Sequence, residues 1–190
     1  EGNWEATMAP WFNVRKAAQV AAFFALQETG EINILKLIKL VYMADRKFME
    51  LYDVPILNDQ FVSMPHGPVN SLTYDYASGT EESPQWNEFL AGRAGHMIGL
   101  VREMSEADLD ELSRAEVHVL GLVWADLGHM DRFQIRDHTH DNCPEWEDPN
   151  GSSFPIPSSR VFNFLGKQHS DELEDRILSE RQVAANLAGE

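Results

Sequence analysis

Residues 34–52 read Ile34-Leu35-Lys36-Leu37-Ile38-Lys39-Leu40-Val41-Tyr42-Met43-Ala44-Asp45-Arg46-Lys47-Phe48-Met49-Glu50-Leu51-Tyr52. This stretch is rich in good helix formers and contains neither Gly nor Pro. At about 100° per residue, one narrow stripe holds all its charged side chains except one, and apolar or aromatic side chains cover the rest. The stripe consists of Lys36, Lys39, Arg46, Lys47 and Glu50, with Met43 among them. A helix that is apolar over most of its circumference is enclosed by its domain, so we expect a central buried helix at about 34–52.

Asp45 is the exception, because it falls in the middle of the apolar arc. An unpaired buried carboxylate is costly, so we expect it to have a partner: a hydroxyl, a His or Arg side chain, or a run of backbone N–H groups. We interpret Asp45 as a structural residue that holds the following loop to the helix. The alternative is a catalytic carboxylate with a perturbed pKa, but no second carboxylate lies at helical spacing on that face to share acid–base work.

The remaining patterns predict a mainly α (α+β) fold. Helices are expected at 14–28, 116–127 and 130–138, with a short acidic helix from Ser105 and a last acidic helix from Ser170 that frays beyond Gln182. Leu173, Ile177 and Leu178 form the apolar stripe of that last helix. A small β-hairpin is expected near 56–65, with Asn58-Asp59 as the turn signal, followed by a rigid loop at 65–69. A long polar loop is expected at 139–153.

The domain boundaries follow from these patterns. Residues 1–12 read as an N-terminal extension, of which residues 1–7 lack periodicity and read as a remnant outside the native domain. Residues 13–165 read as one domain, and residues 166–190 as an acidic C-terminal helix and tail. A chain of 190 residues with 43% apolar content fits this single-domain interpretation.

The charge balance limits the partners that the protein can have. Asp and Glu number 31 against 15 Lys and Arg, which gives a formal net charge of −16. This excess argues against nucleic acid as the primary partner and against an anionic membrane surface, and it suits a basic protein partner. The chain has no apolar run of membrane-spanning length and no secretory signal, and its one cysteine suits a reducing compartment. We therefore expect a cytoplasmic protein.

Few residues point to catalysis or metal binding. The one cluster with metal-like residue types is His138-Thr139-His140-Asp141-Asn142-Cys143, but its spacing matches no zinc motif, so we expect neither a metal nor another cofactor. Cys143 precedes Pro144, which has no N–H to offer an oxyanion hole. The sequence contains no nucleophile elbow, phosphate loop, dinucleotide fingerprint or His-Glu-x-x-His motif. We expect no catalytic residues and a protein that is not an enzyme, with a metal-dependent or cysteine hydrolase as the weakest alternative.

Several motifs, in their order and spacing, resemble one known family. They are Lys39-Leu40-Val41-Tyr42-Met43-Ala44-Asp45-Arg46, Tyr52-Asp53-Val54-Pro55-Ile56, Phe61-Val62-Ser63-Met64-Pro65-His66-Gly67-Pro68-Val69, the helix 113–128, Arg136-Asp137-His138 and Pro144-Glu145-Trp146. Together they are similar to the Panacea domain of the SocA-like, phage-associated antitoxins, over residues 13–165. The motif residues that this resemblance singles out are Tyr42, Asp45, Arg46, His66, Gly67, Pro68, His138 and Trp146.

The resemblance implies an antitoxin of a type II toxin–antitoxin system without catalytic activity. Such a protein neutralises a cognate toxin, encoded beside it, by direct protein–protein binding, and the acidic charge indicates a basic toxin. The alternative within the family is an adaptor that delivers the toxin to a protease. We expect the toxin contacts among Phe61, Met64, Tyr74, Glu172 and Asp175.

The chain also departs from the family pattern. It has no additional helix-turn-helix segment, and Asp137-His138 stands where a Ser-His pair is common. Residues 84–104 and the C-terminal helix match poorly, and we expect toxin specificity to lie in such variable parts.

Overall fold

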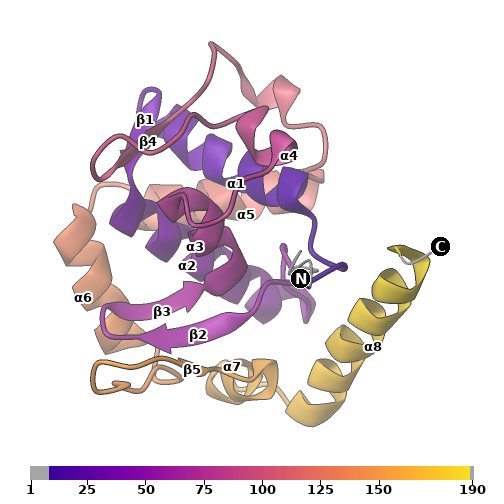
Figure 1. The fold of residues 1–190 in the computed structure, drawn as a ribbon. Coiled ribbons are helices and arrows are strands. Elements are labelled where there is room, and N and C mark those ends of the chain that lie inside the picture. Colours follow the sequence, from indigo (N-terminus) through magenta and orange to yellow (C-terminus); the bar gives the residue numbers. More distant parts are fainter. Residues whose placement is uncertain (1–8, 189–190) are drawn as a thin grey trace, which may run out of the picture.

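The computed structural model describes residues 9–188, so the expectation for residues 1–7 lies outside the described residues (Figure 1). The helices are α1 (Val14–Gln27), α2 (Ile34–Tyr52), α3 (Ser71–Ser78), α4 (Pro84–Asn87), α5 (Arg114–Leu127), α6 (Arg132–Asn142), α7 (Ser158–Phe164) and α8 (Ser170–Ala188), with a 3₁₀ turn at Glu106–Asp108. The strands are β1 (Glu31–Asn33), β2 (Phe61–Met64), β3 (Gly67–Asn70), β4 (Met97–Gly99) and β5 (Phe154–Pro155). The strands pair antiparallel in two small sheets, which confirms the predicted mainly α (α+β) class.

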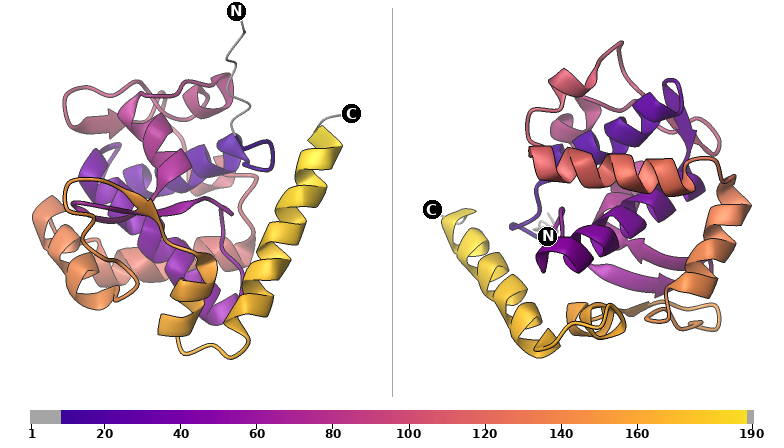
Figure 2. Two further views of the ribbon diagram at one scale, coloured as in Figure 1. Left: turned by 60° about the horizontal axis from the view of Figure 1, so that its bottom comes forward. Right: turned by 180° about the vertical axis from the view of Figure 1, so that it is seen from behind.

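Helix α2 is the centre of the molecule, as its sequence predicts. Asn33 caps it by accepting hydrogen bonds from the N–H groups of Leu35 and Lys36. The helix contacts α1, α3, α5, α6 and the β3 strand, and it crosses between α5 and the β2–β3 hairpin (Figure 2). The charged stripe is less exposed than its pattern indicates, because Lys36 and Lys39 are buried under these neighbours.

The predicted hairpin exists, but its turn lies seven residues later than Asn58-Asp59. Strands β2 and β3 pair from Phe61 opposite Asn70 to Met64 opposite Gly67, so Pro65-His66 form the turn. The predicted turn at Asn58-Asp59 is wrong because the Asp59 carboxylate instead binds the start of α3. Strand β5 pairs on the other side of β2. Pro68 therefore lies in the edge strand β3, where a residue without an N–H group is tolerated.

The second sheet joins segments that the sequence pattern left unassigned. Strand β1 immediately precedes α2 and pairs with β4, with Ile32 opposite Ile98. Both isoleucines are buried, so this pair closes one end of the core.

The C-terminal half corrects two predictions. Helix α6 continues to Asn142, so His140 lies on a helix and not in the predicted polar loop, whereas His138 lies on a helix as predicted. Helix α8 continues through Gln182 to Ala188, and it stands beside the other elements with its C-terminal end far from the sheets (Figures 1 and 2). Ile177 is buried, as predicted for the apolar stripe, but Leu178 is exposed. The division of the chain at residues 12 and 165 stays a prediction.

Candidate functional site

Asp45 is buried in the core and ties three segments together. Its Oδ1 accepts hydrogen bonds from the backbone N–H groups of Ile56 (2.7 Å) and Leu57 (3.1 Å), and its Oδ2 accepts one from the Asn70 side chain (2.6 Å). Burial raises the pKa of Asp45 to about 7, although the bonds from Leu57, Asn70 and Ile56 favour the ionised form. These contacts join α2 to the loop after it and to the end of β3, which is the geometry that a structural role requires.

Asp59 forms a second buried node that sequence reasoning missed. Its carboxylate accepts hydrogen bonds from the N–H groups of Gln60, Leu72 and Thr73 and from the Thr73 hydroxyl, at 2.6–2.9 Å. Leu72 and Thr73 lie in the first turn of α3, where N–H groups have no partner within the helix. Burial raises the pKa of Asp59 to about 6. The only sequence signal was an Asp twelve residues before a helix start, which local capping rules do not detect.

Tyr42 and Arg46 meet at one buried carboxylate. The Tyr42 hydroxyl donates to Glu145 Oε1 (2.7 Å), and Arg46 donates from Nε to the same oxygen (2.6 Å). Glu145 is fully buried, and Arg160 donates to its backbone carbonyl (2.8 Å). Burial raises the pKa of Tyr42 well above its usual value, so the hydroxyl keeps its proton and donates. This cluster attaches the Pro144-Glu145-Trp146 segment to α2.

The hairpin turn packs against α6 and Trp146. Gly67 has a φ of 107°, and a Cβ added there would lie 3.0 Å from Thr139 Oγ1 and 3.1 Å from Lys39 Nζ. Trp146 donates from its indole N–H to the carbonyl of Met64 (2.9 Å), and its ring stacks on His140 at 4.1 Å between centroids. Burial, and then the nearby Lys39 charge, lower the pKa of His140.

The remaining motif residues lie around this packing. Pro68 offers its carbonyl to Lys39 Nζ at 2.8 Å. His66 is exposed at the tip of the hairpin. His138 lies one turn before Asn142, which bonds its carbonyl. The structure thus gathers Gly67 and Pro68 with Lys39, and Trp146 with His140, whereas His138 stands apart.

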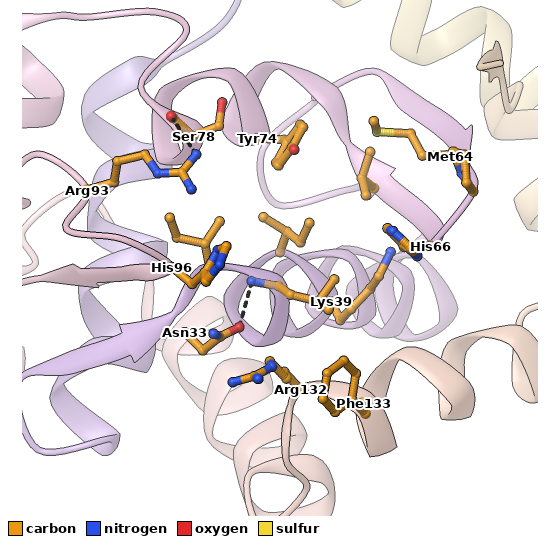
Figure 3. Close-up of a pocket in the computed structure, with 15 residues that line it drawn as sticks. Asn33, Lys39, Met64, His66, Tyr74, Ser78, Arg93, His96, Arg132 and Phe133 are labelled. Atoms are coloured by element: carbon orange, nitrogen blue, oxygen red, sulfur yellow. Dashed lines mark hydrogen bonds between the residues drawn. The ribbon is translucent and has the colours of Figure 1, made fainter. Parts of the chain in front are cut away.

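A pocket of about 390 Å³ opens beside the hairpin (Figure 3). Three residues singled out from the sequence line it: Met64, His66 and Tyr74. Most of the others come from the start of α2, the segment before β4 and the start of α6, so they are far apart in the chain. Sequence reasoning did not identify the pocket because no local pattern brings these segments together.

The predicted toxin contacts do not form one surface. Phe61 is only 4% exposed and packs edge-on against Tyr42, so it has no surface to offer a toxin and we exclude it from the proposed contacts. Met64 and Tyr74 line the pocket, whereas Glu172 and Asp175 are exposed on α8.

Cys143 is unsuited to nucleophilic chemistry in this fold. Its side chain is buried against Met43, and burial raises the pKa of the thiol to about 12, so no thiolate forms at neutral pH. Within residues 9–188, no group of three or more His, Cys, Asp or Glu side chains is placed to hold a metal ion. None of the helices in this range combines the length and apolar character needed to cross a membrane.

Comparison with known proteins identifies the class. The model of the family described as "Antitoxin SocA-like, Panacea domain" matches residues 37–147, which is more than half of the chain. The chain therefore belongs to the SocA-like antitoxin family and carries its Panacea domain. No curated protein and no solved structure gave a significant match. The matched range contains most of α2, the hairpin, α6 and Glu145, and it ends before α7 and α8.

Proposed function

We propose that this protein is the antitoxin of a type II toxin–antitoxin system and neutralises a cognate protein toxin in the cytoplasm by binding it directly. Membership of the SocA-like antitoxin family is the observation that carries the proposal. The net charge of −16 supports a basic toxin, because complementary charge speeds association and disfavours wrong partners.

Helix α8 is the surface that we propose for the toxin. The helix is anchored as far as Arg181: Ile177 is buried, Glu174 accepts from the Ser159 N–H group (2.8 Å), and Arg181 binds the carbonyl of Asp59 (2.8 Å). Its second half exposes Val183 (59%) and Leu187 (69%). Exposed apolar side chains that share a helix face suit a protein contact.

Acidic side chains extend this proposed surface toward the start of α8. Asp171, Glu172 and Asp175 are all exposed, and their one ion-pair contact among residues 9–188 is that of Glu172 with His169 (3.6 Å). Their charge is therefore available to a basic partner. Because α8 lies outside the matched range, a toxin contact there fits the prediction that specificity resides in the variable parts.

Co-expression with the neighbouring gene tests the proposal. That gene product alone should arrest growth, and this protein should restore growth and be recovered in complex with the toxin. Measurement of the toxin level then separates direct masking, which leaves the toxin present, from delivery to a protease, which shortens its lifetime. A harmless neighbouring gene product would remove the main support for neutralisation.

Two pairs of variants test α8 itself. Val183→Glu with Leu187→Glu should abolish rescue, whereas Leu122→Glu on α5, at a side chain 41% exposed, should leave rescue intact. Glu172→Lys and Asp175→Lys, each made singly, should weaken the complex, with Asp126→Lys on α5 as the matched charge control. All of these positions are exposed, so loss of folding does not explain a selective effect. Equal rescue by all variants would place the toxin surface elsewhere.

A further inference from the structure

The pocket beside the hairpin has an apolar and aromatic lining and a volume in the range of small-molecule sites. Ile34, Ile38 and Val69 supply its apolar part, and Tyr74 and Phe133 supply aromatic rings. These side chains come from α2, β3, α3 and α6, so packed elements of the core hold the shape of the pocket (Figure 3).

The charge of the pocket is opposite to the charge of the protein. Lys39, Arg93 and Arg132 line it together with His66 and His96, and no Asp or Glu is among its lining residues. The whole chain has about twice as many acidic as basic side chains, with 31 Asp and Glu against 15 Lys and Arg. A random patch of this surface would therefore contain more carboxylates than cations.

The three cations of the pocket have no carboxylate partner. Lys39 is completely buried, and its ammonium group donates to the Pro68 carbonyl. Arg93 binds the carbonyls of Gly95 and Ser78, and Arg132 lies over the Phe133 ring at 4.6 Å. Among the described residues, none of the three is within 4.0 Å of a carboxylate oxygen.

The buried ammonium of Lys39 is the most informative of these groups. Buried charged side chains are normally paired, because an isolated charge loses its hydration. Burial lowers the pKa of Lys39 to about 7, and an anion bound beside Lys39 would favour its charged form. A Lys ammonium has three N–H donors, and a single carbonyl acceptor leaves capacity for a further acceptor.

Two helices also begin at the pocket. Its lining includes Ile34 and Leu35 from the first turn of α2, and Arg132 and Phe133 from the first turn of α6. The N-terminal end of a helix carries partial positive charge and favours an anion nearby. The neutral Asn33 caps α2, so the start of α2 adds a positive field to the pocket. Asp131 caps α6 with a carboxylate, and its charge offsets the field of that helix end.

We propose that this pocket binds a small organic anion, with a phosphate or carboxylate group held by Lys39, Arg93 and Arg132 and an apolar or aromatic body against Tyr74 and Phe133. This site is separate from the proposed toxin surface on α8 and does not depend on the antitoxin function. An acidic side chain of a partner protein is a different occupant, and the experiment below distinguishes it.

Titration of the intact protein with matched probes tests the proposal. The phosphate arm uses adenosine 5′-monophosphate, with adenosine and inorganic phosphate as controls. The carboxylate arm uses N-acetylphenylalanine, with its neutral amide as the control. Calorimetry measures affinity, and backbone NMR shifts locate binding. We expect at least one charged probe to bind at the pocket and its neutral counterpart to bind more weakly, and the arm that binds identifies the anionic group.

Variants at the rim then establish which side chains hold the anion. Arg93→Gln and Arg132→Gln should each weaken binding about tenfold or more, the range for loss of a charged hydrogen bond. Arg114→Gln, at an exposed arginine on α5 outside the pocket, should leave binding unchanged. Circular dichroism checks the folding of a further variant, Lys39→Met, in which the buried ammonium is removed.

Three results would overturn the proposal. One is that no charged probe binds or shifts the pocket amides at millimolar concentration. Another is that the rim variants bind as tightly as the native protein. The third is that no probe binds while Arg132→Gln weakens the toxin complex, because the occupant would then be a carboxylate of the partner protein.

Discussion

Asn70 donates a hydrogen bond of 2.6 Å to Asp45, which lies 25 positions earlier in the chain. The Oδ1 atom of Asn70 is buried without a hydrogen-bond partner. An Asn at position 45 would keep one acceptor oxygen for the N–H groups of Ile56 and Leu57. Its side-chain NH₂ group would face residue 70, where the Asn70 oxygen would accept from it once the Asn70 amide is flipped. The native carboxylate, in contrast, is buried at a pKa of about 7.

The Asp45→Asn variant should therefore change the pH dependence of stability. In the folded protein the pKa of Asp45 is about 7, against 3.8 for an ordinary Asp, so the folded state binds the proton more tightly. The contribution of Asp45 to the free energy of unfolding is then full below pH 4 and is lost as the pH rises to about 7. The variant lacks this loss, so its stability relative to the native protein should rise across that window. Urea denaturation at several pH values measures the difference, and a constant difference would contradict a raised pKa.

Gly67→Ala should destabilise the protein by about 2–4 kcal/mol, because a left-handed backbone and close contacts act together. The new methyl group would lie 3.0–3.1 Å from Thr139, His140 and Lys39. Gly151→Ala is the control, since Gly151 has a φ of 84° but nothing within 4 Å of an added Cβ. Its loss should be about 1 kcal/mol, which isolates the backbone contribution. If Gly67→Ala and Gly151→Ala reduce the free energy of unfolding equally, as measured by thermal or urea unfolding, the atoms around Gly67 move away from the new methyl group and the close contacts cost nothing.

The Tyr42–Glu145 bond should couple two distant parts of the chain. Tyr42→Phe removes the 2.7 Å bond and should cost about 1–2 kcal/mol, because the buried Glu145 loses one of its donors. Combined with Glu145→Gln, the two losses should be non-additive by about 0.5–3 kcal/mol, as for residues in direct contact. A double-mutant cycle measured by urea unfolding gives this coupling. Additive losses of unfolding free energy would mean that Tyr42 and Glu145 stabilise the protein independently of the hydrogen bond between them.

Cys143 should be unreactive until the protein unfolds. Its thiol is buried and its pKa is raised to about 12, so both access and thiolate formation are suppressed at pH 8. Titration with a thiol reagent should give no fast reaction in the folded state and one equivalent in denaturant, since the sequence has one cysteine. A fast full equivalent without denaturant would show that the segment around Cys143 opens readily.

The features predicted from the sequence are those with a local signal. The periodicity of residues 34–52 predicts α2 and its burial, because nearly the whole circumference of that helix is apolar. Ser113 and Glu116 form a capping box at the start of α5, and their spacing of three residues is a pattern that is visible in the sequence. The polar partner expected for Asp45 is present as two backbone N–H groups and one amide.

The features missed from the sequence depend on contacts between distant segments. Asp59 resembles a turn residue locally, and only the folded chain brings it to the first turn of α3. Lys39 shares its stripe with other charged side chains, which suggests exposure, but packing of the hairpin and α6 covers it. The pairing of β1 with β4 joins three-residue segments whose sequences carry no strand pattern long enough to detect. The cationic pocket, whose lining runs from Asn33 to Phe133, is missed for the same reason.

The attachment of α8 has a consequence for how such proteins can diversify. The helix lies outside the matched range, follows a short connection after Phe164, and is held mainly through α7, the buried Ile177 and the Arg181 contacts with Asn58 and Asp59. Recombination in the connection at residues 165–169 would exchange the whole of α8 without altering the Asp45 or Glu145 clusters. A replacement helix that kept equivalents of Ile177 and Arg181 would pack on the rest of the protein in the same way and present different exposed side chains. On the proposal that α8 contacts the toxin, such an exchange would change the target of the protein without refolding its core.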